Sequence, residues 1–165
     1  MTDDELMEAF EAGRMPPDGF PHRAHVRMAW IYLRRHALEV AMARFSSALR
    51  RFAAAQGEPG RYHETITVAY VVLIHDRMAG TGAANWNAFA AEHADLLVWK
   101  PSILDTYYSP DILWSDRARD SFLPPDRAPL PRARDEGGPE GPPLRRPSLY
   151  DARHGNPFHE GAGEI

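Results

Sequence analysis

One long amphipathic repeat restricts the fold of this 165-residue chain more than any other feature. Between residues 38 and 52, apolar side chains recur at intervals of three and four, which is the period of an α-helix and not of a β-strand. Arg44, Arg50 and Arg51 fall on the opposite face. The pattern predicts a helix over residues 37–56 with one buried face, formed by Leu38, Ala41, Met42, Phe45, Ala48, Leu49 and Phe52.

Capping and turn residues mark further helices on both sides of this repeat. Thr2 and Glu5 have the spacing of a capping box, which predicts a helix over residues 3–12. Pro21 suits the first position of a second helix, over residues 21–35. Shorter helices are expected at residues 85–93, 102–108 and 110–122, the last with Ser109 as its N-cap.

The segment from residue 62 to residue 78 has two readings. Residues 66–74 are rich in β-branched side chains, which are common in strands. The segment is too long for one strand, however, and no second convincing strand exists to pair with it. We therefore predict a central helix and an all-α fold, a compact bundle of five to seven helices over residues 1–124.

The sequence changes character at residue 125. Eight prolines and six glycines fall within residues 125–165, with mixed charge and almost no apolar periodicity. Such a segment buries too little apolar surface to offset its ordering entropy. We expect it to be a disordered tail, separate from the bundle.

Composition excludes several classes of function. The chain has no cysteine, which excludes disulfides, thiolate metal sites, iron–sulfur clusters and cysteine nucleophiles. A net charge of -4 argues against a nucleic-acid partner, which normally requires a basic face. The first residues lack the pattern of a signal peptide, and the longest apolar run, residues 66–74, is too short to span a bilayer. We expect a cytoplasmic protein without a membrane partner; the oligomeric state is not indicated.

Two short motifs contain most of the chemistry-bearing side chains. His22 and His25 open the second predicted helix, three residues apart and so on one side of it. His63 and Glu64 open the helix predicted from residue 62. Short connections make consecutive helices antiparallel, so both of these helices begin at the same end of the bundle. The four side chains are therefore expected to converge there.

Imidazole and carboxylate side chains from facing helices can form a metal site without thiols. His22, His25 and His63 are the predicted ligands of a divalent ion, either zinc, iron, manganese or nickel. Glu64 lies about 100° from His63 around the helix. It is a candidate general acid/base or ligand, with two alternatives: a residue that orients a histidine, or a first-turn acid that complements the helix dipole.

Two functions follow from this cluster. The first is a metal-binding domain that acts as a small-molecule hydrolase or another metalloenzyme, with a metal-bound water as the reactive species. The second is a non-catalytic module whose metal-free pocket binds a small molecule or a protein. A purely structural role for the histidines is a third reading. The sequence leaves open whether the chain is an enzyme.

The remaining histidines and the tryptophans have simpler interpretations. His36 is expected to help cap the second helix, and His93 to lie on the surface. His75 is an outside candidate for the site. All four tryptophans are expected in the core or at its edge: Trp30, Trp86, Trp99 and Trp114.

The two motifs together resemble a known family. The pattern Phe-x-His-x-x-His-Val at residues 20–26, paired with Tyr-His-Glu-Thr-Ile-Thr at residues 62–67, is similar to that of small bacterial proteins usually described as hypothetical or uncharacterised. The resemblance covers roughly residues 3–127. It implies no activity and assigns no catalytic residue.

Overall fold

The computed structural model describes residues 1–15 and 20–132. Within these two ranges the chain forms seven α-helices and three short 3₁₀ helices, without any β-strand. This confirms the predicted all-α fold. It also confirms the helical interpretation of the segment that follows residue 62, in spite of its many β-branched side chains.

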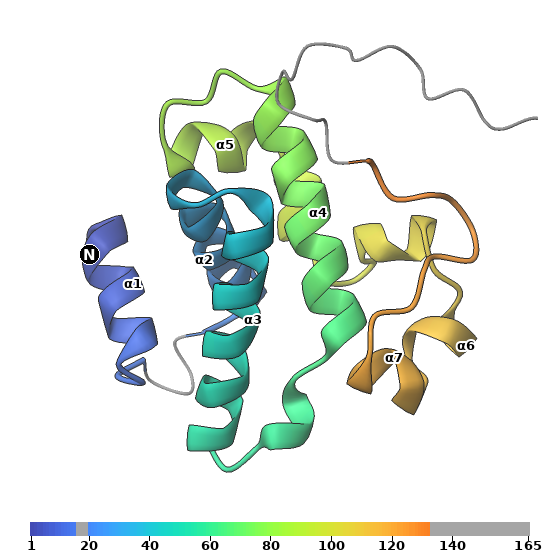
Figure 1. The fold of residues 1–165 in the computed structure, drawn as a ribbon. Coiled ribbons are helices and arrows are strands. Elements are labelled where there is room, and N and C mark those ends of the chain that lie inside the picture. The colour runs from blue at the N-terminus through green and yellow to red at the C-terminus, as the bar shows by residue number, and fades with distance from the viewer. Residues whose placement is uncertain (16–19, 133–165) are drawn as a thin grey trace, which may run out of the picture. The chain divides into compact units, whose positions relative to one another are not determined.

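Three helices, each antiparallel to the next one along the chain, form the centre of the fold: α2 (His22–Arg35), α3 (Leu38–Ala55) and α4 (Glu64–Gly80). Figure 1 shows α3 and α4 side by side and running in opposite directions, with a short 3₁₀ turn, η2 (Pro59–Arg61), between them. Each of the three helices packs against the other two. As a result, α2 and α4 begin at the same end of the bundle.

Burial on several sides explains why α4 is helical. Its side chains face α2, α3 and α7 (Asp116–Asp120), and Ala69, Val71, Leu73 and Ile74 are nearly inaccessible to solvent. The hydroxyl of Thr67 donates to the His63 carbonyl oxygen at 2.8 Å, so it is satisfied within the helix. Packing on several sides outweighs the weak helix propensity of β-branched residues.

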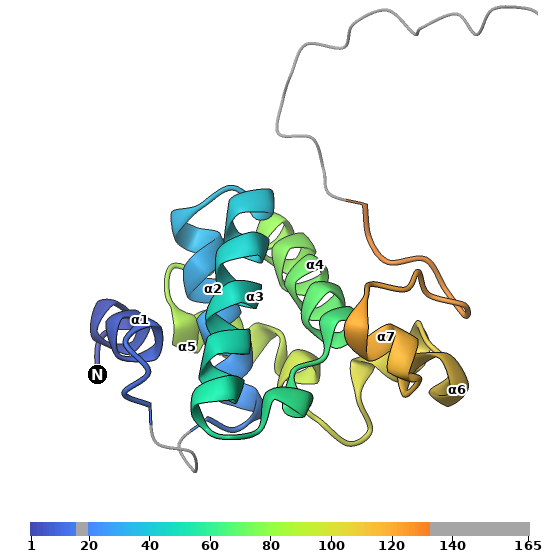
Figure 2. The ribbon, with the colours of Figure 1, turned by 60° about the horizontal axis from the view of Figure 1, so that its bottom comes forward.

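The remaining helices surround this centre. The capping box is confirmed at α1 (Asp3–Glu11), where Thr2 and Glu5 bond reciprocally. The helix predicted over residues 110–122 is instead two short ones, because the Ser115 hydroxyl accepts from the Ala118 N–H and starts a new helix. Figure 2 shows these last helices beside α4. The peripheral elements are α5 (Trp86–Glu92), η3 (Ala94–Leu97), η4 (Ile103–Thr106), α6 (Pro110–Leu113) and α7 (Asp116–Asp120).

The packed domain extends past residue 124, where the sequence predicted its end. The Arg127 N–H donates to the Tyr107 carbonyl oxygen at 3.0 Å, and Asp126 accepts from the Ser109 N–H at 2.8 Å. Leu130 packs against the core. The rest of the predicted tail, residues 133–165, lies outside the described residues.

No helix in the described ranges combines the length and the apolar character needed to cross a membrane.

Candidate functional site

A pocket of about 450 Å³ lies at the end of the bundle where α2 and α4 begin. Its walls come from α2, α3 and α4, and from the segments that contain η2 and α7. A volume of this size accommodates a small organic molecule. Most of the lining is apolar or aromatic, and the aromatic part consists of Phe20, Phe45, Phe52, Tyr62, Tyr70, Trp99 and Trp114.

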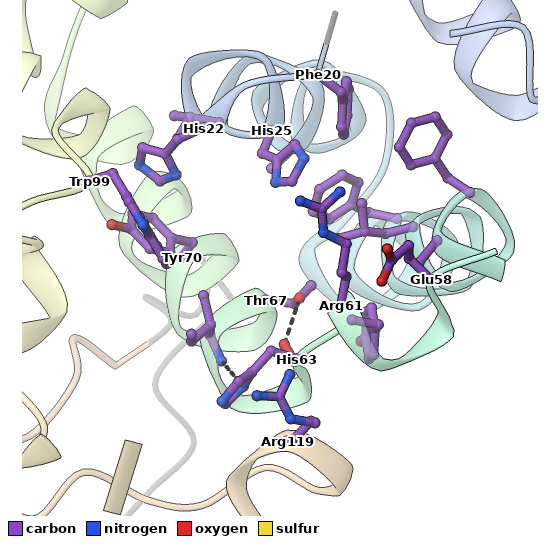
Figure 3. Close-up of a pocket in the computed structure, with 18 of the residues that line it drawn as sticks. Phe20, His22, His25, Glu58, Arg61, His63, Thr67, Tyr70, Trp99 and Arg119 are labelled. Carbon is purple, nitrogen blue, oxygen red and sulfur yellow. Dashed lines mark hydrogen bonds between the residues drawn. The ribbon is translucent and has the colours of Figure 1, made fainter. Parts of the chain in front are cut away.

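Three of the four predicted site residues line this pocket. His22 and His25 lie next to each other on α2, and Figure 3 shows His63 across the cavity from them. Glu64 does not line the pocket. The structure therefore brings the three histidines around one cavity and leaves the carboxylate outside it.

His22 is held in a fixed orientation. Its Nε2 lies 2.9 Å from the Leu96 carbonyl oxygen, and because a carbonyl only accepts, Nε2 carries the hydrogen. The ring also packs edge-on against Tyr70 and lies against Trp99, at centroid distances of 4.9 Å and 5.1 Å. Burial lowers the pKa of His22, although the bond to Leu96 opposes this effect. A neutral imidazole with hydrogen on Nε2 leaves Nδ1 as an acceptor.

Of the three pocket histidines, His25 is the one whose ring nitrogens bond to no other described residue. It packs against Phe20, with ring centroids 4.2 Å apart. Among the described residues, neither of its nitrogens has a hydrogen-bond partner. Burial, and then the neighbouring His22, lower the pKa of His25 to about 4. At neutral pH it presents one donor and one acceptor that a ligand can use.

Both nitrogens of His63 are engaged by the protein. Its Nδ1 accepts from the Ile66 N–H at 3.3 Å, so His63 is the N-cap of α4. The sequence had predicted that His63 lies within this helix, and this is wrong. Its Nε2 donates to the Leu113 carbonyl oxygen at 2.9 Å. Burial is the main cause that lowers the pKa of His63. The imidazole is a neutral structural link between α4 and α6.

These contacts bear on the predicted metal site. Within residues 1–15 and 20–132, no three His, Asp or Glu side chains are grouped closely enough to hold a metal ion. Because each ring nitrogen is already bonded, His63 would have to release either Ile66 or Leu113 to become a ligand. A divalent ion held by His22, His25 and His63 stays a prediction from the sequence.

Glu64 occupies the first turn of α4. Its carboxylate accepts hydrogen bonds from the Tyr62 hydroxyl and from Arg50, with which it also forms an ion pair. The Arg50 guanidinium in turn lies over the Tyr62 ring. Among the alternatives for Glu64, this arrangement favours a first-turn acid that also fixes Tyr62 in the pocket wall.

The sequence placed Trp99 and Trp114 in the core or at its edge, and this is wrong for both. Trp30 and Trp86 are buried as predicted, whereas Trp99 and Trp114 remain 37% and 54% exposed. The two exposed indoles meet edge-to-face with centroids 6.3 Å apart, and both line the pocket. Both tryptophans lie in short segments without a clear apolar periodicity. The sequence therefore contained no signal that would distinguish a tryptophan in a pocket wall from one in the core.

The charged residues of the pocket were also missed by the sequence. Glu58 and Arg61 come from the turn between α3 and α4, and Arg119 comes from α7. The Gly-Glu-Pro-Gly sequence at residues 57–60 predicted only a break between helices. Turns that connect rigid helices often contribute binding residues. The two charged residues in this short turn between two predicted helices could therefore have marked it as a candidate.

The remaining histidines lie elsewhere. His36 is the C-cap residue of α2, as expected, and its Nε2 lies 3.0 Å from the Arg44 guanidinium. His93 was expected on the surface but packs against Phe89 and is partly buried. His75 is partly buried on α4 and does not line the pocket.

Comparisons of the chain with family models, with curated proteins and with solved structures find no match. The resemblance to small bacterial proteins therefore stays an expectation from the two motifs.

Replacing His63 tests whether it is a cap or a metal ligand. We expect His63→Ala to lower the free energy of unfolding by about 2 kcal/mol, because α4 loses its cap and the Leu113 carbonyl loses a donor. Thermal unfolding should show the same loss in EDTA and in zinc chloride, and His36→Ala should cost far less. A loss that appears only with zinc would identify His63 as a ligand.

The titration of His25 tests the polarity of the pocket. An unfolded histidine has a pKa of about 6.5, whereas folded His25 has one of about 4. Between these values the unfolded chain binds more protons, so the contribution of His25 to stability is complete above pH 6.5 and falls as the pH drops toward 4. An NMR titration, with His25→Gln for assignment, should give the low value. A midpoint near the ordinary value would contradict the burial of this imidazole.

Proposed function

We propose that this domain binds a small organic molecule with a flat apolar body in the pocket between α2, α3 and α4. The main support is the pair of exposed tryptophans, Trp99 and Trp114, on the wall of an aromatic cavity of about 450 Å³. Exposing two large indoles to water is unfavourable, and contiguous exposed apolar surface commonly marks a binding site.

The interior of the pocket continues this apolar surface. Phe20 and Phe52 pack against each other with ring centroids 5.1 Å apart, and Ala29 and Ala53 leave space between the larger side chains. An aromatic ligand could stack between these walls, gaining both area burial and favourable ring geometry.

Two imidazoles place polar groups on the α2 side of this mostly apolar cavity. His22 is oriented by Leu96, Tyr70 and Trp99, and His25 offers its ring nitrogens beside it. A mostly apolar cavity with a small number of fixed polar groups is typical of small-molecule sites, where the polar groups supply orientation and specificity. Of the two functions derived from the sequence, these contacts favour the metal-free binding module over the metalloenzyme. A cytoplasmic location remains a prediction.

Binding of N-phenylnaphthylamine, a neutral aromatic compound that becomes fluorescent in apolar sites, tests the proposal. The purified chain should bind it with a saturable increase in fluorescence. Ala53→Phe fills the pocket and should weaken binding at least about tenfold, a loss of roughly 1.4 kcal/mol. Ala54→Phe is the matched control, because Ala54 is exposed on the same helix and does not line the pocket.

A second pair of variants tests the same proposal in case Ala53→Phe does not fold. Trp114→Ala should weaken binding of the compound without loss of helical circular dichroism, because Trp114 is half exposed. Phe122→Ala, which removes an exposed aromatic ring outside the pocket, should leave binding unchanged. Unaltered binding in both pocket variants would refute the proposal.

A further inference from the structure

The charges around the pocket do not cancel. Arg61, Arg119 and Glu58 line it, whereas His22 and His25 are neutral near pH 7 because burial lowers the pKa of each imidazole. His63 is neutral for the same principal reason. Two guanidinium groups and one carboxylate therefore leave one positive charge in excess at an otherwise apolar site.

Among the described residues, Arg61 has no counter-ion of its own. Five arginines of the described residues form ion pairs with carboxylates: Arg14, Arg27, Arg35, Arg50 and Arg77. Arg61 is not among them, and within the described ranges its guanidinium donates no hydrogen bond, even to Glu58 on the same turn. Figure 3 shows its side chain directed into the pocket, toward His25.

The backbone that positions Arg61 is anchored. The Arg61 N–H donates to the Glu58 carbonyl oxygen at 3.0 Å, which closes the η2 turn. Arg119 reaches from α7 and donates to the Gly60 carbonyl oxygen at 2.7 Å. Part of the hydrogen-bonding capacity of Arg119 therefore stabilises the turn. Of the two pocket arginines, Arg61 is the one whose guanidinium is available to bind a ligand.

A guanidinium recognises a carboxylate through two parallel charge-assisted hydrogen bonds. The neutral His25 imidazole faces the same space and can donate one more hydrogen bond to the same oxygen pair. The Glu58 carboxylate also lines the pocket and repels negative charge on a ligand. A phosphate with two negative charges therefore fits this site less well than a carboxylate with one.

We propose that the ligand of this pocket is an aromatic monocarboxylate, with its acid group between Arg61 and His25 and its ring against the aromatic walls. This inference rests on the proposed binding function and adds the chemical class of the ligand. Its test must therefore separate recognition of the ring from recognition of the charge.

Naphthaleneacetate and naphthaleneacetamide share the same ring and differ in the charge of one group. Measured at neutral pH by displacement of N-phenylnaphthylamine, the acetate should bind about tenfold tighter than the amide. The preference should diminish as sodium chloride is added, because Arg61 is exposed and its field is screened.

Arg61→Gln should reduce the preference to less than about twofold, and the affinity for the acetate should fall far more than that for the amide. Arg61→Lys keeps the charge but loses the paired geometry, so it should retain part of the preference. The matched control is Arg51→Gln, since Arg51 is exposed on α3, bonds to Ser47 and does not line the pocket. It should behave as the unaltered chain.

The outcomes are distinguishable. Equal binding of acetate and amide would overturn the carboxylate assignment, and a preference that survives in Arg61→Gln would overturn the placement of the acid group at Arg61; either result would leave the binding function standing. Failure of the chain to bind N-phenylnaphthylamine and both naphthalene compounds would overturn the two together.

Discussion

The arrangement of this domain depends on the imidazole of His63, which is bonded at both nitrogens. One nitrogen caps the first turn of α4, and the other donates to the Leu113 carbonyl of α6. Because both bonds require a neutral ring with hydrogen on Nε2, the same side chain sets the start of α4 and the position of the segment that carries Trp114. The ring also meets the Trp114 indole edge-on, with centroids 6.1 Å apart. The wall of the pocket on this side thus follows from one buried side chain.

The opposite wall is formed in a related way. His22 donates to the Leu96 carbonyl and so ties the start of α2 to η3, the 3₁₀ helix that precedes Trp99. Two histidines at two helix starts therefore hold two connecting segments, and each segment brings one tryptophan to the pocket. Of the three pocket histidines, His25 is the one that no described residue hydrogen-bonds. His22 and His63 thus hold the pocket walls, whereas His25 and Arg61 are the groups proposed to contact a ligand.

The fold was largely predictable from the sequence, because its strongest signals are local. The apolar period of residues 38–52 and the capping box at Thr2 predicted helices that the structure contains. Short connections also indicated that α2 and α4 begin together, which places His22, His25 and His63 around one cavity. Glu64, which the sequence also expected at this end of the bundle, lies outside the cavity.

The features that the sequence missed depend on contacts between distant segments. His63 was treated as a residue inside a helix, whereas its role as a cap depends on the conformation before α4 and on Leu113, fifty residues away. The exposure of Trp99 and Trp114 depends on where their short segments pack. Arg61 can be recognised as a candidate binding residue only when the pocket beside its turn is known. None of these relations leaves a periodic signal in the chain.

We propose that a flat apolar molecule occupies the cavity beside His25 and the two exposed tryptophans. Intermolecular nuclear Overhauser effects between bound N-phenylnaphthylamine and the protein are the decisive measurement. The naphthalene protons should show contacts to the indoles of Trp99 and Trp114 and to the imidazole of His25. Contacts confined to exposed apolar residues outside the pocket, such as Val40 or Phe122, would contradict it.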